Sequence, residues 1–509
     1  MAMASKTMDM TKGPLFVKIL KLSVPMIFTG ILQLLFSTAD LIVIGQFAGS
    51  GSLAAVGATT SLNHLIINLV LGLSVGANVL MSQAIGAKNR DKAERVVHTS
   101  MLLAIVAGAA FSLIGFFISR PALTLMKTDP EVLDKATLYL EIIFLGTIAN
   151  VVYNFGAAIL RAKGDTTRPL IYLTIAGVVN VILNIVFVVV LKMDVEGVAI
   201  PTVASQALSA VLVVIALLRE KGECRFIPKK LRFHATEVKE ILGIGVPSGV
   251  LSSLFSIANV LIQSQVNSFG KEFMAASSAS SSIEAFTYVA MNAVSSSTSA
   301  VVGQNYGAGK KKRIVTAMWQ SSLLIMIAFA VIGGPTMIFA RPFASLYNSE
   351  PHVIDYTLER LFVIMPTYFL CGLAEVFISA LRGIGHSTAP TIAAIGCVCA
   401  YRIVWVNTVF VWFRSIEVLF ACYPISYVLE LIVLPVMFVV FYRKLPPEKV
   451  EKAEAELLTE EIAEDKSDDL ADNACDEPTE NPFGEVEPQS DEFGQPDDEP
   501  PLRCRNDER

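Results

Sequence analysis

Twelve stretches of this 509-residue chain are apolar and long enough to cross a lipid bilayer. A spanning helix needs about 20 apolar residues, because a helix rises only ~1.5 Å per residue. The connecting segments are short and rich in glycine, proline and charge, and no run shows the alternation typical of transmembrane β-strands. We therefore predict an all-α polytopic membrane protein whose twelve transmembrane helices cover residues 22–47, 53–81, 96–118, 132–159, 169–191, 197–218, 240–269, 274–302, 314–340, 356–381, 389–413 and 416–442.

Composition supports this class and excludes others. Hydrophobic residues make up 53% of the chain and charged residues only 17%, whereas soluble domains average roughly 25% charge. The seven cysteines show no disulfide or metal-binding spacing, and no glycine-rich phosphate loop or cluster of nucleophiles is present. We expect no enzymatic activity, no cofactor and no nucleic-acid partner, with the lipid bilayer as the main surroundings.

Basic residues between the spans predict the orientation. Loops on one side carry 26 lysines and arginines, and the alternate loops carry 6. Because basic residues are retained in the cytoplasm, this bias predicts that both termini are cytoplasmic.

The chain repeats itself. A Leu-Arg-x-x-Gly-x-[Ser/Thr]-Thr-x-Pro pattern occurs at 160–169 and again at 381–390, an offset of 221. A Gln-x-x-Gly-Ala pattern at 83–87 returns at 304–308 with the same offset. Each half holds six spans, so the halves should be parallel and related by a pseudo-two-fold axis along the membrane normal. The predicted parts are an N-terminal lobe (1–218), a basic cytoplasmic linker (219–239), a C-terminal lobe (240–445) and an acidic cytoplasmic tail (446–509).

These repeated motifs, together with Pro25 and Asp40 in the first span, resemble the multidrug and toxic compound extrusion family of bacterial antiporters over about residues 14–445. The resemblance implies a V-shaped pair of six-helix lobes around a central cavity, in the bacterial inner membrane. It implies export of amphipathic, often cationic organic compounds in exchange for H⁺ or Na⁺, and we expect a monomer. The positions that match the family's site for the coupling ion are Asp40, Asn180, Asn184 and Thr202. Some relatives carry aspartate where this chain has Asn184, which leaves both H⁺ and Na⁺ open.

The energetic cost of a charge within the membrane also indicates that Asp40 has a function. A charged group at the bilayer centre costs about 2.5–3.5 kcal/mol on insertion scales. A carboxylate with two amides and a hydroxyl offers Na⁺ an oxygen shell, and the same carboxylate in a poorly solvated lobe could exchange a proton. Pro25 removes one helical hydrogen bond from the same span, so we hypothesise that neutralised Asp40 favours a bent first helix. The alternative is a structural carboxylate that neighbouring polar groups satisfy.

The second half contains further polar groups within its spans. Candidates for the substrate cavity are Glu284, Tyr288, Met291 and Glu430. Arg402 needs a partner in the membrane, and we expect a structural ion pair with Glu375 or with Glu430.

The alternative function is a flippase for lipid-linked oligosaccharides with a related two-lobe architecture. Such a protein needs several cations in its cavity to hold a diphosphate, whereas Arg402 is the clear mid-span cation here against four carboxylates. This balance favours cationic cargo. The tail has 23 acidic and 6 basic residues and accounts for the net charge of −6, so we expect it to be disordered.

Overall fold

The computed structural model describes residues 8–447 and folds them into helices without any strand. The acidic tail from residue 448 onwards lies outside the described residues. The helices of the first half are α1 (Leu15–Phe47), α2 (Ser50–Gly86), α3 (Arg90–Leu125), α4 (Pro130–Ala162), α5 (Thr167–Asn184) with the π-helical turn η1 (Ile185–Val190), and α6 (Glu196–Arg219).

The second half is more interrupted than the first. It begins after the short helix η2 (Pro228–Lys230). Its elements are α7 (Ala235–Asn267), α8 (Lys271–Gly307), α9 (Lys311–Ala328), η3 (Phe329–Gly333), α10 (Gly334–Ile338), α11 (Ala340–Tyr347), α12 (Pro351–Ile364), η4 (Met365–Thr367), α13 (Tyr368–Gly383), α14 (Thr388–Ala394), η5 (Ile395–Ala400), α15 (Tyr401–Asn407), α16 (Val409–Trp412) and α17 (Ile416–Arg443).

The predicted spans agree with these helices to within a few residues. Eleven helical stretches in the described part are long and apolar enough to cross a membrane. The remaining predicted span lies in α8, which has the length to cross but contains many serines. This helix contacts α1, α2, α9, α12 and α13, so protein surrounds it on several sides. Its polar side chains can therefore be satisfied away from lipid.

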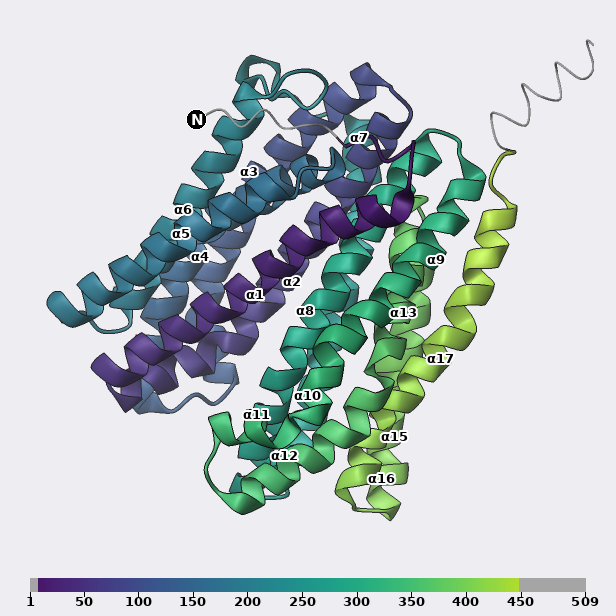
Figure 1. Cartoon of the computed structure of the whole chain (residues 1–509). Coiled ribbons are helices and arrows are strands. Elements are labelled where there is room, and N and C mark those ends of the chain that lie inside the picture. Colours follow the sequence, from purple (N-terminus) through teal and green to yellow (C-terminus); the bar gives the residue numbers. More distant parts are fainter. Residues whose placement is uncertain (1–7, 448–509) are drawn as a thin grey trace, which may run out of the picture. The chain divides into compact units, whose positions relative to one another are not determined.

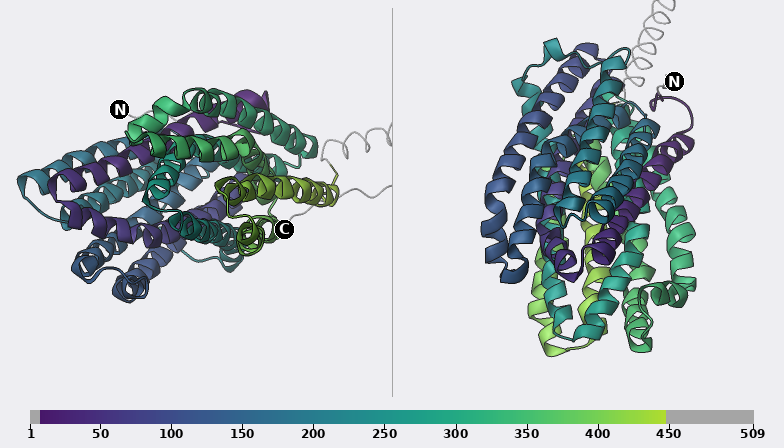
Figure 2. Two further views of the ribbon diagram at one scale, coloured as in Figure 1. Left: turned by 90° about the horizontal axis from the view of Figure 1, so that it is seen from below. Right: turned by 90° about the vertical axis from the view of Figure 1, so that its left-hand side faces the viewer.

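The two sequence halves form two groups of helices that lie side by side (Figures 1 and 2). Within the first group, α4 packs against α2, α3 and α6. The groups meet through α1 and α2 on one side and α7 and α8 on the other, with contacts between α2 and α7, α1 and α8, and α2 and α8. Gly72 allows a close approach of α2 and α7, since a Cβ at this position would collide with the backbone of Gly249.

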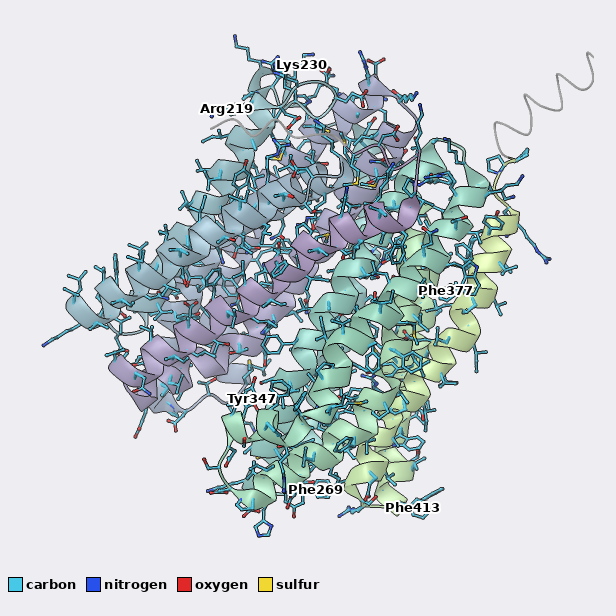
Figure 3. All side chains as sticks on the ribbon, viewed as in Figure 1. Arg219, Lys230, Phe269, Tyr347, Phe377 and Phe413 are labelled. Atoms are coloured by element: carbon cyan, nitrogen blue, oxygen red, sulfur yellow. The ribbon has the colours of Figure 1, made fainter. Side chains whose placement is uncertain are left out.

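One end of the bundle carries the basic loops 87–89, 163–166, 220–234, 308–310 and 384–387, and we call it the basic end. Arg219 and Lys230 mark this end at the top of Figure 3, and Phe269, Tyr347 and Phe413 mark the opposite end. The halves are joined at the basic end by two equivalent hydrogen bonds. Gln83 Nε2 donates to the carbonyl oxygen of Gly383 at 2.9 Å, and Gln304 Nε2 donates to that of Ala162 at 2.7 Å. The offset of 221 relates both donors and both acceptors.

The linker between α6 and α7 packs onto the first half. Glu220 is buried and forms ion pairs with Lys163 and Arg168. Burial disfavours the charged carboxylate, but the hydrogen bonds from Lys163 and Arg168 outweigh it and lower the pKa of Glu220. Cys224 and Phe226 are buried nearby.

Candidate functional site

The four residues expected at the coupling-ion site come together in the first half. Asn184 at the end of α5 donates from Nδ2 to Oδ1 of Asp40 on α1 at 2.5 Å. The same nitrogen lies 3.4 Å from Oδ1 of Asn180, and Nδ2 of Asn180 lies 3.4 Å from the hydroxyl of Thr202 on α6. Three helices thus bring one carboxylate, two amides and one hydroxyl into a single cluster.

One oxygen atom of the cluster has no hydrogen-bond partner among the described residues. This atom is Oδ1 of Asn184, a residue that is fully buried. A buried acceptor without a donor is costly unless a ligand satisfies it. Oxygen atoms of a carboxylate, an amide and a hydroxyl suit a hard cation such as Na⁺, and the carboxylate alone suits H⁺.

Local structure explains why Asp40 and Asn184 meet. Gly177 lies two turns before Asn184 on α5, and a Cβ at Gly177 would collide with the ring of Phe36 on α1. The missing side chain lets α1 and α5 approach closely next to the cluster. The helix then changes to a π-helical turn after Asn184, and such turns are frequent at functional sites.

Sequence reasoning missed one member of this neighbourhood. The phenol of Tyr139 on α4 is buried and interacts electrostatically with Asp40. Tyr139 lies in an ordinary apolar stretch, so no spacing or charge could have indicated it.

In the second half, Glu284 on α8 forms an ion pair with Arg360 on α12, with 3.4 Å between Oε2 and Nη2. Ser280 donates to the other carboxylate oxygen at 2.8 Å, and Nη1 of Arg360 donates to the hydroxyls of Ser277 and Ser281, both at 2.7 Å. Both charged side chains are less than a tenth exposed. Glu284, which we expected to line a cavity, is therefore neutralised within a packed helix pair, and Arg360 is a buried cation that the sequence analysis overlooked.

The expected ion pair of Arg402 is not formed among the described residues. Its guanidinium donates instead to the hydroxyl of Ser426 at 3.0 Å and to Oδ1 of Asn259 at 3.3 Å, and it lies 4.1 Å from the centre of the Tyr423 ring. The aromatic face and neutral acceptors take the place of a carboxylate. Glu375 interacts electrostatically with Arg382 rather than with Arg402. Glu430 does interact electrostatically with Arg402 but forms no ion pair with it, and its Oε1 is buried without a hydrogen-bond partner among the described residues.

The other two candidates for the substrate cavity, Met291 and Tyr288, also lie outside the pocket that the structure shows. Met291 is almost fully buried and belongs to the core of the second half, where its sulfur packs at the position of Gly372. Tyr288 is 39% exposed. Neither residue belongs to the pocket described next.

A small, partly open pocket is lined by both halves. The first half contributes side chains from α1, α2 and α4, including Met26, Asn78 and Arg161, and the second half contributes Ser299 from α8 and Arg382 from α13. Both arginines were predicted to be loop cations, but the structure places them in the last turns of α4 and α13. A pocket between two lobes is the usual position for the binding site of a secondary transporter.

Comparisons with known proteins agree with this architecture. The family model MatE matches twice, over residues 25–186 and 247–406, once in each half. Similar proteins include YpnP of Bacillus subtilis, named as a probable multidrug resistance protein, at 26% identity over 75% of this chain and 85% of the relative. The FAD transporter of Shewanella oneidensis is 26% identical over 72% of this chain and 81% of the relative.

Solved structures extend the likeness to the fold. An outward-facing multidrug resistance transporter of the same family has a TM-score of 0.81 and 22% identity, and covers 87% of this chain and 99% of that chain. A transporter from Pyrococcus furiosus, described by the reverse polarity of its binding pocket, matches with the same score and coverage. The two-lobe fold of twelve spans expected from the sequence is thereby confirmed, and so is a location in the cell membrane. The chain belongs to the MatE family, the multidrug and toxic compound extrusion transporters.

Proposed function

We propose that the protein is a secondary active exporter of amphipathic or cationic drug-like compounds, driven by H⁺ or Na⁺ that binds at Asp40. The observation that carries this proposal is the contact of Asp40 with Asn184, which connects the first helix to a buried polar cluster containing an unpartnered oxygen. The relatives named as multidrug resistance proteins support the cargo class.

The coupling step follows from the charge of Asp40. While Asp40 is ionised, it accepts a hydrogen bond from Asn184 and favours the present packing of α1 against α5. Binding of H⁺ or Na⁺ neutralises the carboxylate and weakens that preference. Pro25 lies 15 residues earlier in α1 and leaves the helix short of one hydrogen bond, so α1 can bend there at low cost. A bent α1 would narrow the pocket, because Leu22 and Met26 line it.

The test is efflux of ethidium and norfloxacin in everted membrane vesicles, driven separately by an imposed pH gradient and an imposed Na⁺ gradient. The wild type should export under at least one gradient, and Asp40→Asn should lose export under both. Asp134→Asn is the matched control, since that carboxylate forms an exposed ion pair with Arg120. Export by Asp40→Asn at the wild-type rate would refute the coupling role.

Flipping of lipid-linked oligosaccharides is the second candidate, and the two arginines of the pocket favour it because diphosphates bind cations. No efflux of either drug under either gradient, together with translocation of a lipid-linked sugar, would select this function instead.

A further inference from the structure

Arg161 and Arg382 occupy equivalent positions in the two halves and line the same pocket. Each lies in the last turn of its helix, where the helix dipole stabilises a cation. The dipole therefore explains why an arginine can occupy each of these positions. It does not explain why two guanidinium groups share one cavity, since like charges in a poorly solvated space repel each other.

Neither arginine has an ion-pair partner in residues 8–447. Arg161 makes one hydrogen bond, from Nε to the carbonyl oxygen of Ala157 at 3.3 Å. Nε of Arg382 is buried without an acceptor among the described residues, and Glu375 is the carboxylate that acts electrostatically on Arg382 in this part of the chain. A guanidinium has five donors, so most of the donor capacity of both groups remains free.

Two cations that follow Arg161 closely in the chain are satisfied. Lys163 and Arg168 both pair with Glu220. The pocket itself has no acidic residue in its lining, and its neutral groups include Ser299, whose buried hydroxyl also lacks a partner. Arg161 and Arg382 differ from these two cations, because neither forms an ion pair among the described residues.

We propose that Arg161 and Arg382 bind an anionic group, carboxylate or phosphate, on the transported compound. Guanidinium groups hold such anions through paired, charge-assisted hydrogen bonds. A bound anion would also supply Arg161 with a counter-charge and add a second one for Arg382, which already has Glu375 nearby. The inference rests on the proposed transport function and adds a chemical requirement to its substrate. A zwitterion with one carboxylate meets this requirement and the expectation of cationic cargo together.

The test compares norfloxacin with norfloxacin ethyl ester, which differ only in the free carboxylate. Binding to the purified full-length protein is measured by fluorescence titration, without any ion gradient. The wild type should bind the acid more tightly than the ester, and the double variant Arg161→Gln/Arg382→Gln should lose about tenfold or more in affinity for the acid alone. The ratio of the two affinities in one preparation is the readout, so an inactive fraction of the protein does not affect it.

Further variants and a competing anion show which property of the two arginines causes the preference for the acid. Arg161→Lys/Arg382→Lys keeps both charges and should retain part of the preference for the acid, and Arg120→Gln at an exposed pair should leave it unchanged. Inorganic pyrophosphate should displace norfloxacin but not the ester, which would extend the site to phosphates. An equal loss of acid and ester, or no loss at all, would overturn the proposal. If the vesicles export neither drug while the purified protein still prefers the acid over the ester, the result would instead count against gradient-driven export.

Discussion

Gly86 at the end of α2 lies directly against Gln304 of α8, and a Cβ on Gly86 would collide with the glutamine's carbonyl oxygen. The opposite half repeats the arrangement, with Gly307 against the carbonyl oxygen of Gln83. The side chains of the same two glutamines also hold the halves together through hydrogen bonds. The Gln-x-x-Gly-Ala repeat found in the sequence is thus one of the places where the two halves touch.

Gly86→Ala should weaken this contact, because backbone atoms cannot move aside as a flexible side chain would. We expect overpacking to lower the stability of the present state by about 1–3 kcal/mol. Thermal unfolding in detergent and the efficiency of a cysteine cross-link across the basic end measure the effect. Gly57→Ala in the same helix is the control, since nothing lies within 4 Å of a Cβ there. Equal behaviour of the two variants would contradict the close packing.

Gly177→Ala should push α5 away from α1, because the new methyl group meets the ring of Phe36. The Asp40 and Asn184 side chains would then separate, and ion-driven export should fall while binding of norfloxacin to the purified protein persists. Gly243→Ala in α7, where a Cβ meets nothing within 4 Å, is the matched control. Full coupling in Gly177→Ala would show that the contact between α1 and α5 is dispensable.

Glu220→Gln should destabilise the protein at neutral pH by about 1–3 kcal/mol, since Lys163 and Arg168 lose a charged acceptor. The folded state lowers the pKa of Glu220, so its contribution is complete above the unfolded pKa of about 4.3 and is lost as the pH falls through the folded value. Unfolding temperatures of wild type and variant should differ at neutral pH and converge in acid. Glu223→Gln removes a more exposed pair with Arg90 and should change stability by only about 0–1 kcal/mol. A difference that grows in acid would contradict the assignment.

Glu284→Gln should cost about 3–5 kcal/mol, because it leaves Arg360 buried without its counter-charge. Arg360→Met should be similarly destabilising, and the double variant should cost less than the sum of the two. Because Arg360 already neutralises Glu284, we expect the ratio of ethidium to norfloxacin binding to stay constant in these variants. A changed ratio would restore Glu284 as a substrate contact.

The spans were predictable because an apolar run of membrane length is a local property of the chain. The pairing of Arg402 was not predictable, because it depends on the rotation of α15 relative to α17, which brings Ser426 and Tyr423 rather than a carboxylate to the guanidinium. Arg360 was missed for a related reason, since its partner on α8 is separated from it by 76 residues.

The candidate site was also predictable from the sequence only in part. The meeting of Asp40 with Asn184 followed from the resemblance to a known family, and the structure brings the two together. Arg161 and Arg382 were read as orientation signals, because the predicted spans ended at 159 and 381, just before the two arginines. Helices that continue for two or three more residues include both arginines, and their side chains reach the pocket.

The serine-rich helix α8 has a consequence for how the protein is made. Taken alone, it is too polar to rank with the eleven apolar helices. Ser295 and Glu284 find their partners on α13 and α12, two helices that follow α8 in the chain. A segment of this kind gains little from entering lipid by itself. Its integration during synthesis therefore depends on neighbours such as α12 and α13, so the second half has to assemble as a group rather than one helix at a time.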